Sequence, residues 1–280
     1  KNMVSLVQEK NSNSQNVNKY DEAFYQLNVE ELIKAGAHFG HPSSKWNPNF
    51  RKFISTIKNG IHIINLEMTL KYIDSALNEL SKIVTSGGNI LFVGTKSQAK
   101  DAVQSSADYC GMFYITERWL GGTLTNYSTI KKSIRRLKLL EKDSSSIYNN
   151  LTKKEKGSLQ REKLRLADLH RGIKDMRHLP SALFVIDAKH EKISISEANC
   201  LGIPTFGIVD TNTDPNVLDF PIPANDDSIK TIQLILNYIS KALFDSLGGN
   251  KNKESDDLLV EDEKVSEDIN KIEKKVLENK

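Results

Sequence analysis

Cysteine is scarce in this sequence. Only Cys110 and Cys200 occur among its 280 residues, far apart and without the spacing of metal ligands. This usage argues against a disulfide scaffold or a zinc finger and fits a reducing compartment. Apolar runs are short as well: none approaches the roughly 20 residues needed to cross a bilayer, and the first residues lack a secretory pattern. We expect a soluble cytoplasmic protein with no membrane partner, from a bacterium rather than an organelle, because a transit-peptide pattern is also missing.

Recognisable catalytic motifs are missing too. There is no nucleophile elbow and no zinc-protease helix. Ser, His and Asp residues are all present, but their spacing does not indicate a catalytic set. The run Gly94-Thr95-Lys96-Ser97 follows an apolar stretch and opens a helical pattern, where parallel sheets bind phosphate. Neither the P-loop nor the dinucleotide spacing is complete, and any such fold needs a turn here. We therefore expect that the protein is not an enzyme. The alternative that stays open is a sugar-phosphate or nucleotide-binding enzyme that uses this loop.

No metal site is predicted. His38 and His41 are three residues apart without an accompanying cysteine, which favours loop histidines or phosphate contacts over metal ligands. Aspartates end two predicted strands and follow in the next loops: Asp187, Asp210, Asp214, Asp226 and Asp227. Carboxylates at one edge of a sheet could hold Mg²⁺, but turn and helix-cap chemistry explains their positions better. We therefore expect neither a metal nor another cofactor.

Short apolar runs alternate with helical patterns along most of the chain. The predicted strands are 89–93, 112–116, 182–186 and 205–209, and the predicted helices are 66–85, 97–110, 194–201 and 228–247. This alternation indicates right-handed crossovers and a parallel sheet with helices on both faces, so the fold class is α/β. Ahead of it we expect a helix over 29–35, a loop over 36–52, and a hairpin over 53–64 that turns at Asn59-Gly60.

Positive charge is concentrated in one segment. The whole chain has a net charge of +3, whereas residues 131–174 carry fourteen Lys or Arg against five Asp or Glu, a net charge of +9. Two apolar stripes at helical spacing flank a polar, Ser-rich stretch at 143–150, which predicts two antiparallel helices joined by a turn. Such a basic hairpin favours a polyanion or acidic-protein contact over a purely solvated arm.

The chain thus divides into five predicted segments. They are a disordered extension at 1–28, the first part of the α/β body at 29–126, the inserted basic hairpin at 127–174, the second part of the body at 175–247, and a charged tail at 248–280. Residues 251–280 have a net charge of −3 and a loose apolar stripe. A disordered tail and a helix that docks on a partner therefore both stay open.

The run 117–126 joins the body to the basic segment. It contains Arg118, Trp119, which is one of two tryptophans, and the pair Gly121-Gly122. A cation beside a large ring suits stacking with RNA, whereas a tryptophan beside two glycines equally suits a core plug at a tight turn. Because the chain must turn here to enter the hairpin, we interpret Trp119 chiefly as the plug and Arg118 as the RNA contact.

Sequence blocks in family order resemble the bacterial-type small-subunit ribosomal protein two. Two of them are Ala-Gly-Ala-His-Phe-Gly-His at 35–41 and Arg-Trp-Leu-Gly-Gly-Thr-Leu-Thr-Asn at 118–126. The others are 46–48, 59–64, 91–96, 172–176, 179–180, 202–204, 209–215 and 222–227. The resemblance spans about residues 29–247, so it covers most of the chain.

The resemblance implies a flavodoxin-like body with an inserted coiled-coil arm. It also implies a structural constituent of the small ribosomal subunit in translation, which binds ribosomal RNA and neighbouring ribosomal proteins, including the messenger-binding first small-subunit protein. We expect cationic, aromatic and polar residues of these blocks and of the arm to contact RNA: His38, His41, Lys45, Trp46, Asn47, Arg51, Lys58, Lys96, Arg118, Trp119, Asn126, Lys131, Lys132, Arg135 and Arg136.

Overall fold

Five parallel strands form the central sheet of the computed structural model, which describes residues 27–142 and 152–248. The strands are β4 (Ile90–Val93), β5 (Phe113–Ile115), β6 (Ala182–Ile186), β7 (Thr205–Val209) and β8 (Phe220–Pro223). Their order is β5-β4-β6-β7-β8, and all four neighbouring pairs are parallel. In chain order this is 2-1-3-4-5, the order of flavodoxin-like folds. The predicted α/β class is confirmed.

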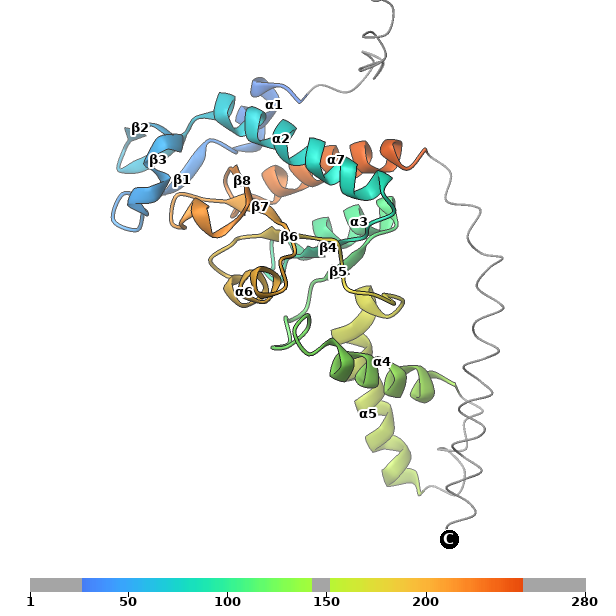
Figure 1. Cartoon of the computed structure of the whole chain (residues 1–280). Helices are drawn as coiled ribbons and strands as arrows, with labels where there is room; N and C mark the ends of the chain where they lie inside the picture. The colour runs from blue at the N-terminus through green and yellow to red at the C-terminus, as the bar shows by residue number, and fades with distance from the viewer. Residues whose placement is uncertain (1–26, 143–151, 249–280) are drawn as a thin grey trace, which may run out of the picture.

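Helices cover both faces of this sheet (Figure 1). One face packs against α1 (Val29–Ala35), α2 (Leu66–Thr85), α3 (Lys100–Cys110) and α7 (Ile229–Ser246), and the other packs against α6 (Lys192–Cys200). Alternate strand residues point to opposite cores: Phe92 and Phe184 lie in the first, Leu91 and Val185 in the second. Among the described helices, none has the length and apolar character of a membrane span.

A small antiparallel sheet precedes the body. It consists of β1 (Phe39–Pro42), β2 (Ile54–Lys58) and β3 (Ile61–Ile64) in the order β1-β3-β2, with the 3₁₀ helix η1 (Pro48–Phe53) between β1 and β2. Asn59 and Gly60 both have positive φ, so the predicted hairpin turn is confirmed. The prediction of a loop over 36–52 is wrong for Phe39–Pro42, which form strand β1. Gly40 lies so close to Thr211 that a Cβ would be 2.5 Å from Thr211 Cγ2, and this tertiary contact is invisible to local patterns.

Strand β8 was not predicted from the sequence. Its residues are Phe-Pro-Ile-Pro, and proline argues against a central strand. The strand lies at the edge of the sheet and pairs with β7 alone, so a missing backbone donor is tolerated there. Two helix starts also differ: α3 begins at Lys100 rather than 97, and α6 begins at Lys192 rather than 194.

Two helices extend away from the body, α4 (Tyr127–Glu141) and α5 (Lys153–His170), followed by the 3₁₀ helix η3 (Arg171–Ile173) (Figure 1). Ser133 contacts His170 while Arg136 contacts Glu162, so the contacts run in opposite directions along the two helices. The predicted turn at 143–150 falls outside the described residues, as do 1–26 and 249–280. The inserted hairpin therefore stays a prediction. Leu27, assigned above to the extension, is buried in the core.

Candidate functional site

Trp119 lies in the core on the α6 face of the sheet. Its ring is 9% exposed and packs in the cluster that contains Leu91, Val93 and Ile195. The indole Nε1 donates a hydrogen bond of 3.0 Å to Glu197 Oε1 of α6. A buried tryptophan usually needs such a partner for its N–H. The position is that of a plug, as the interpretation above expects, and little of the ring is open to stacking.

Glu197 holds the whole loop that leads into α4. Besides Trp119, its carboxylate accepts hydrogen bonds from the backbone N–H groups of Gly122 (2.7 Å), Leu124 (3.0 Å) and Thr125 (3.1 Å), and from Thr125 Oγ1 (3.1 Å). Gly122 has a φ of +85°, which turns these N–H groups toward one point. Burial acts to raise the pKa of Glu197, but the hydrogen bonds outweigh it and the pKa is lowered. We did not predict this residue from the sequence.

Arg118 and Asn126 lie at the two ends of this loop, and both are exposed. The Asn126 side chain accepts hydrogen bonds from Ser128 and Thr129 at the start of α4. The Arg118 guanidinium forms no ion pair or hydrogen bond with any other residue within 27–142 and 152–248. The loop therefore has a buried tryptophan on its inner side and an unpaired cation on its outer side.

The pair α4 and α5 is strongly basic. The two helices together carry eleven Lys or Arg against four Asp or Glu, a net charge of +7 with histidine neutral. Of the predicted contacts on α4, Lys132 and Arg135 are exposed, whereas Lys131 lies over the Tyr127 ring at 4.9 Å from its centroid. Arg136 forms two hydrogen bonds with Glu162 of α5, at 3.1 and 3.2 Å. Three of these cations are available to a polyanion and the fourth joins the helices.

The residues predicted around the small sheet lie in different environments. Lys45, Arg51 and Lys58 are exposed, whereas Trp46 is half-buried with its ring 5.0 Å from that of His62. Asn47 accepts a hydrogen bond from Asn49 N and caps η1. Burial lowers the pKa of His38. The three cations are placed for solvent or a partner, while the other residues serve the local fold.

His41 points into the carboxyl edge of the large sheet. Its Nδ1 lies 2.8 Å from Asp210 Oδ2 and its Nε2 lies 3.4 Å from Asp227 Oδ2. The hydrogen bond to Asp210 is the largest cause of a raised His41 pKa. His41, Asp210 and Asp227 each offer a possible metal-ligand atom within 4.8 Å of one another. Because histidine and carboxylate suit several divalent ions, these three residues could together hold a metal ion. The sequence reasoning did not group them, since 169 residues separate His41 from Asp210.

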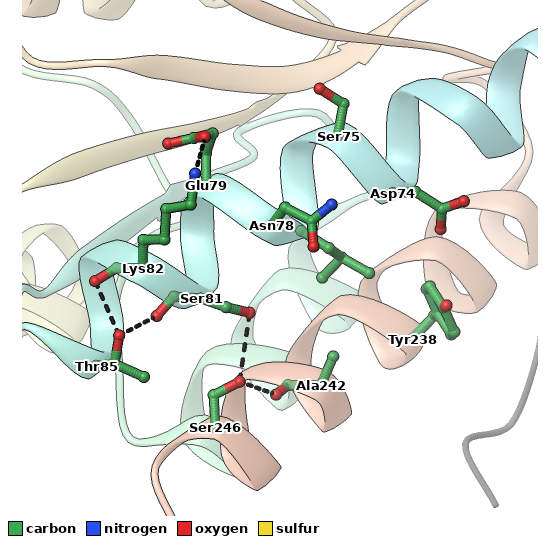
Figure 2. A pocket seen from close by; sticks show the side chains of 11 residues that line it. Asp74, Ser75, Asn78, Glu79, Ser81, Lys82, Thr85, Tyr238, Ala242 and Ser246 are labelled. Atoms are coloured by element: carbon green, nitrogen blue, oxygen red, sulfur yellow. Dashed lines mark hydrogen bonds and ion pairs between the residues drawn. The ribbon is translucent and has the colours of Figure 1, made fainter. Parts of the chain in front are cut away.

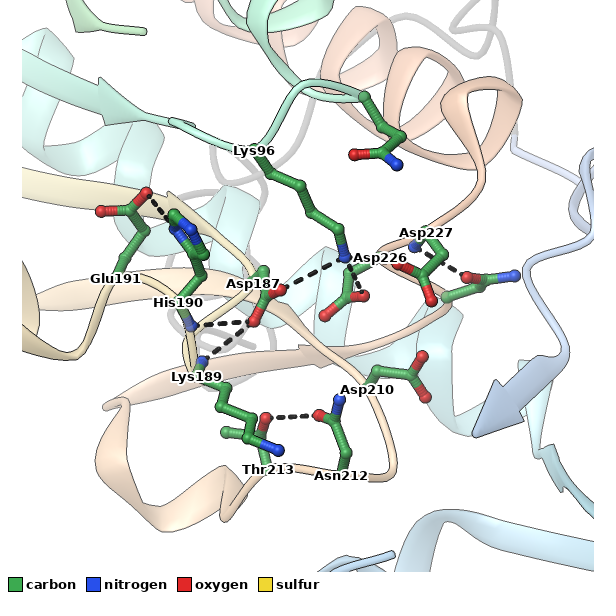
Figure 3. A network of polar contacts seen from close by, with 12 residues as sticks. Lys96, Asp187, Lys189, His190, Glu191, Asp210, Asn212, Thr213, Asp226 and Asp227 are labelled. Atoms are coloured by element: carbon green, nitrogen blue, oxygen red, sulfur yellow. Dashed lines mark hydrogen bonds and ion pairs between the residues drawn. The ribbon is translucent and has the colours of Figure 1, made fainter. Parts of the chain in front are cut away.

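Lys96 occupies the centre of the same edge (Figure 3). Its Nζ lies 3.2 Å from Asp187, 2.8 Å from Asp226 and 2.6 Å from Asp227, and the side chain is only 16% exposed. Asp226 is fully buried; burial, followed by the charges of Asp187 and Asp210, raises its pKa to about 7. Lys96 thus acts as an internal counter-ion. The predicted contact between Lys96 and RNA has no support in this geometry and stays a prediction.

The loop 94–97 is not arranged to hold a phosphate. The N–H and the hydroxyl of Thr95 both donate to the buried carboxylate of Glu191, at 3.0 and 2.6 Å. Lys96 is neutralised by aspartates, and an added anion would meet their excess negative charge. Ser97 precedes α3 by three residues rather than opening it. These contacts remove the features on which the enzyme alternative depended.

A separate groove lies between α2 and α7 (Figure 2). It measures about 740 Å³ and is lined by polar side chains such as Asp74, Asn78 and Tyr238. Ser246 bridges the two helices through Ser81 at 3.3 Å. No residue of the 94–97 loop and none of the strand-end aspartates lines this groove. The groove is therefore separate from the residues that could bind a phosphate or a metal ion.

Fold and charge together define an α/β protein that presents a basic pair of helices beside a flavodoxin-like sheet. The family model described as ribosomal protein S2 matches residues 32–246, and the chain belongs to this family. Relatives include the small ribosomal subunit protein uS2 of Fusobacterium nucleatum subsp. nucleatum, 45% identical over 84% of this chain and 97% of its own length. Another is the uS2 protein of Chloroherpeton thalassium, 49% identical over 82% of this chain and 92% of its own length.

Proposed function

We propose that the protein is a structural constituent of the small ribosomal subunit and binds ribosomal RNA through the basic surface of α4, α5 and the small sheet. The observation that carries the proposal is the net charge of +7 on α4 and α5, with Lys132 and Arg135 exposed. Membership of the ribosomal protein S2 family supports the same function. Cations on phosphates give affinity without enzymatic chemistry.

The test is binding to small ribosomal subunits that lack this protein. We expect co-sedimentation at low salt and a loss of roughly 10³–10⁵ in affinity between 50 and 200 mM salt if six to ten phosphates are contacted. Replacing Lys132 and Arg135 by Glu should weaken binding strongly. The matched control is Lys71→Glu on α2, an exposed residue of the helix layer on the other face of the sheet. Failure of the unaltered protein to co-sediment at low salt would overturn the proposal.

The same family membership supports a proposal about the partners and the location of the protein. We assign the protein to the bacterial cytoplasmic ribosome rather than an organellar one, because both relatives named above are bacterial. Contacts with neighbouring small-subunit proteins, including the messenger-binding first small-subunit protein, belong to the proposal as well. Reconstitution of the subunit with and without this chain tests them, since loss of the messenger-binding protein should accompany its omission.

A further inference from the structure

A cleft of about 480 Å³ lies where the helix pair α4 and α5, called the arm below, meets the α/β body. The loop 117–121 forms one wall and the end of α5 forms the other, through Arg165, Asp168 and Leu169. The two cations of the cleft, Arg118 and Arg165, therefore come from opposite walls. Its volume falls within the roughly 300–1,000 Å³ of sites for small ligands, so a nucleotide-sized group can enter.

The charges of the cleft favour an anion. Its two acids already have cations of their own: Glu117 pairs with Lys100 at 2.8 Å, and Asp168 lies 3.6 Å from Arg171. Arg118 has no ion-pair partner in the described residues. The two carboxylate oxygens of Glu162 already bind Arg136, which lowers the pKa of Glu162, and the charge of Arg165 helps to lower it. Two positive charges thus remain for a ligand, and no described side chain neutralises both.

Each wall combines a leucine with an arginine, and this combination identifies the kind of ligand. Leu120 and Leu169 are half-buried and give the cleft an apolar component, while the guanidinium groups supply planar, forked donors. A ribose-phosphate backbone matches both, because arginine binds phosphate through two parallel N–H bonds and sugar carbons accept apolar contact. An acidic peptide would satisfy the charges but would leave its own backbone groups to be paired.

We propose that this cleft binds the backbone phosphate of a folded ribosomal RNA between Arg118 and Arg165, and that the RNA thereby fixes the angle between arm and body. The inference rests on the proposed function and adds a site to it. Glu197 is the reason that the site is preorganised on the body side, since its hydrogen bonds to Trp119, Gly122 and Leu124 hold the loop from which Arg118 projects. On the arm side, Arg165 belongs to a helix tied to α4 by the Arg136–Glu162 pair.

The test measures binding of the full chain to purified small-subunit RNA across a salt series. We expect Arg118→Ala and Arg165→Ala each to weaken binding about tenfold and to reduce the salt slope by about 0.9 for each phosphate that is no longer neutralised. Lys71→Ala on α2 removes the same charge from the other side of the body and should change neither quantity. Both arginines are exposed, so we expect each variant to keep its fold. Thermal unfolding of each variant checks this.

A photo-crosslinker identifies what enters the cleft. Gly121 lines it, has no positive φ, and has open space where a Cβ would stand, so p-benzoylphenylalanine fits there. We expect a crosslink to ribosomal RNA in the assembled subunit and none from the same group at Lys71. A crosslink from Gly121 to protein instead, or arginine variants that bind like Lys71→Ala, would overturn this inference while leaving the proposed function intact. If the unaltered chain does not bind the RNA, the proposed function itself is lost.

Discussion

Glu197 is expected to be the most sensitive position at the junction of arm and body. In the Glu197→Ala variant, the N–H groups of Trp119, Gly122, Leu124 and Thr125 lose their acceptor at once. Trp119 and Leu124 are buried, and a buried donor without a partner costs about 1–3 kcal/mol. Gly122 is half-buried and Thr125 is exposed, so a lost acceptor costs less there. We therefore expect a loss of about 3–5 kcal/mol in the free energy of unfolding, the range found when one partner of a buried charged contact is removed.

Glu197→Gln separates charge from shape. The amide keeps one acceptor oxygen but turns an NH₂ group toward two of the donors, so we expect a loss of about 2 kcal/mol. The folded-state pKa of Glu197 lies below its ordinary value of 4.5, because the hydrogen bonds to its charged form outweigh burial. A depressed pKa means that the carboxylate stabilises the fold above pH 4.5 and that this contribution is lost as pH falls through the folded pKa. The difference in the free energy of unfolding between the unaltered protein and the Gln variant should therefore become smaller below pH 4.5.

Urea unfolding monitored by tryptophan fluorescence and by circular dichroism measures both effects. The matched control is Lys192→Gln, an exposed charged position on the same helix, which should stay within about 0.5 kcal/mol of the unaltered protein. A Glu197→Ala variant within about 1 kcal/mol of the unaltered protein would refute the reasoning. So would a gap between the unaltered protein and the Gln variant that stays constant down to about pH 3.

Three further predictions concern stability. Trp119→Ala should lower the free energy of unfolding by about 3–5 kcal/mol, as measured in urea, because the ring is buried. Gly172→Ala should lower it by about 1–3 kcal/mol or more, since the new Cβ would lie 2.1 Å from the Tyr114 carbonyl oxygen; an unchanged melting temperature would contradict the packing. Lys96→Met should cost about 3–5 kcal/mol at an alkaline pH where Asp226 is ionised. Because Lys96 lowers the pKa of Asp226, that pKa lies above about 7 in the variant, and thermal melts should show the loss shrinking as falling pH makes Asp226 neutral.

Local patterns predicted most of the fold because its elements are periodic. The helix over 29–35 and the helix over 66–85 have the predicted bounds, and the Asn59-Gly60 turn is where the hairpin signal lay. Strands β1 and β8 escaped prediction for one shared reason: glycine and proline in them suppress strand propensity, and only a partner strand decides the outcome.

The candidate site also contains residues that the sequence could predict and residues that it could not. Burial of Trp119 was predictable because a tryptophan beside a glycine pair at a required turn has few other roles. Its partner Glu197 was not, since 78 residues separate them and nothing local assigns an acid on a short helix to a distant loop. The signal available was one acidic residue on the face of α6 that also carries buried Ile195 and Ala198. The ion pairs of Lys96 were not predictable either, because its sequence context suits phosphate, while two loops bring three aspartates to it.

The small sheet and α1 depend on parts of the chain that are synthesised much later. His41 is fixed by Asp210, 169 residues onward, and the carbonyl oxygen of Ala35 accepts a hydrogen bond from Thr231, 196 residues onward. At about 5–20 residues per second, a nascent chain waits about 10–40 s for these partners. Contacts of such separation form slowly, because loop-closure entropy must be overcome first. Of the described segments, the first to leave the ribosome is therefore among the last to be fixed, and in that interval its strand edges are open to chaperones or to other chains.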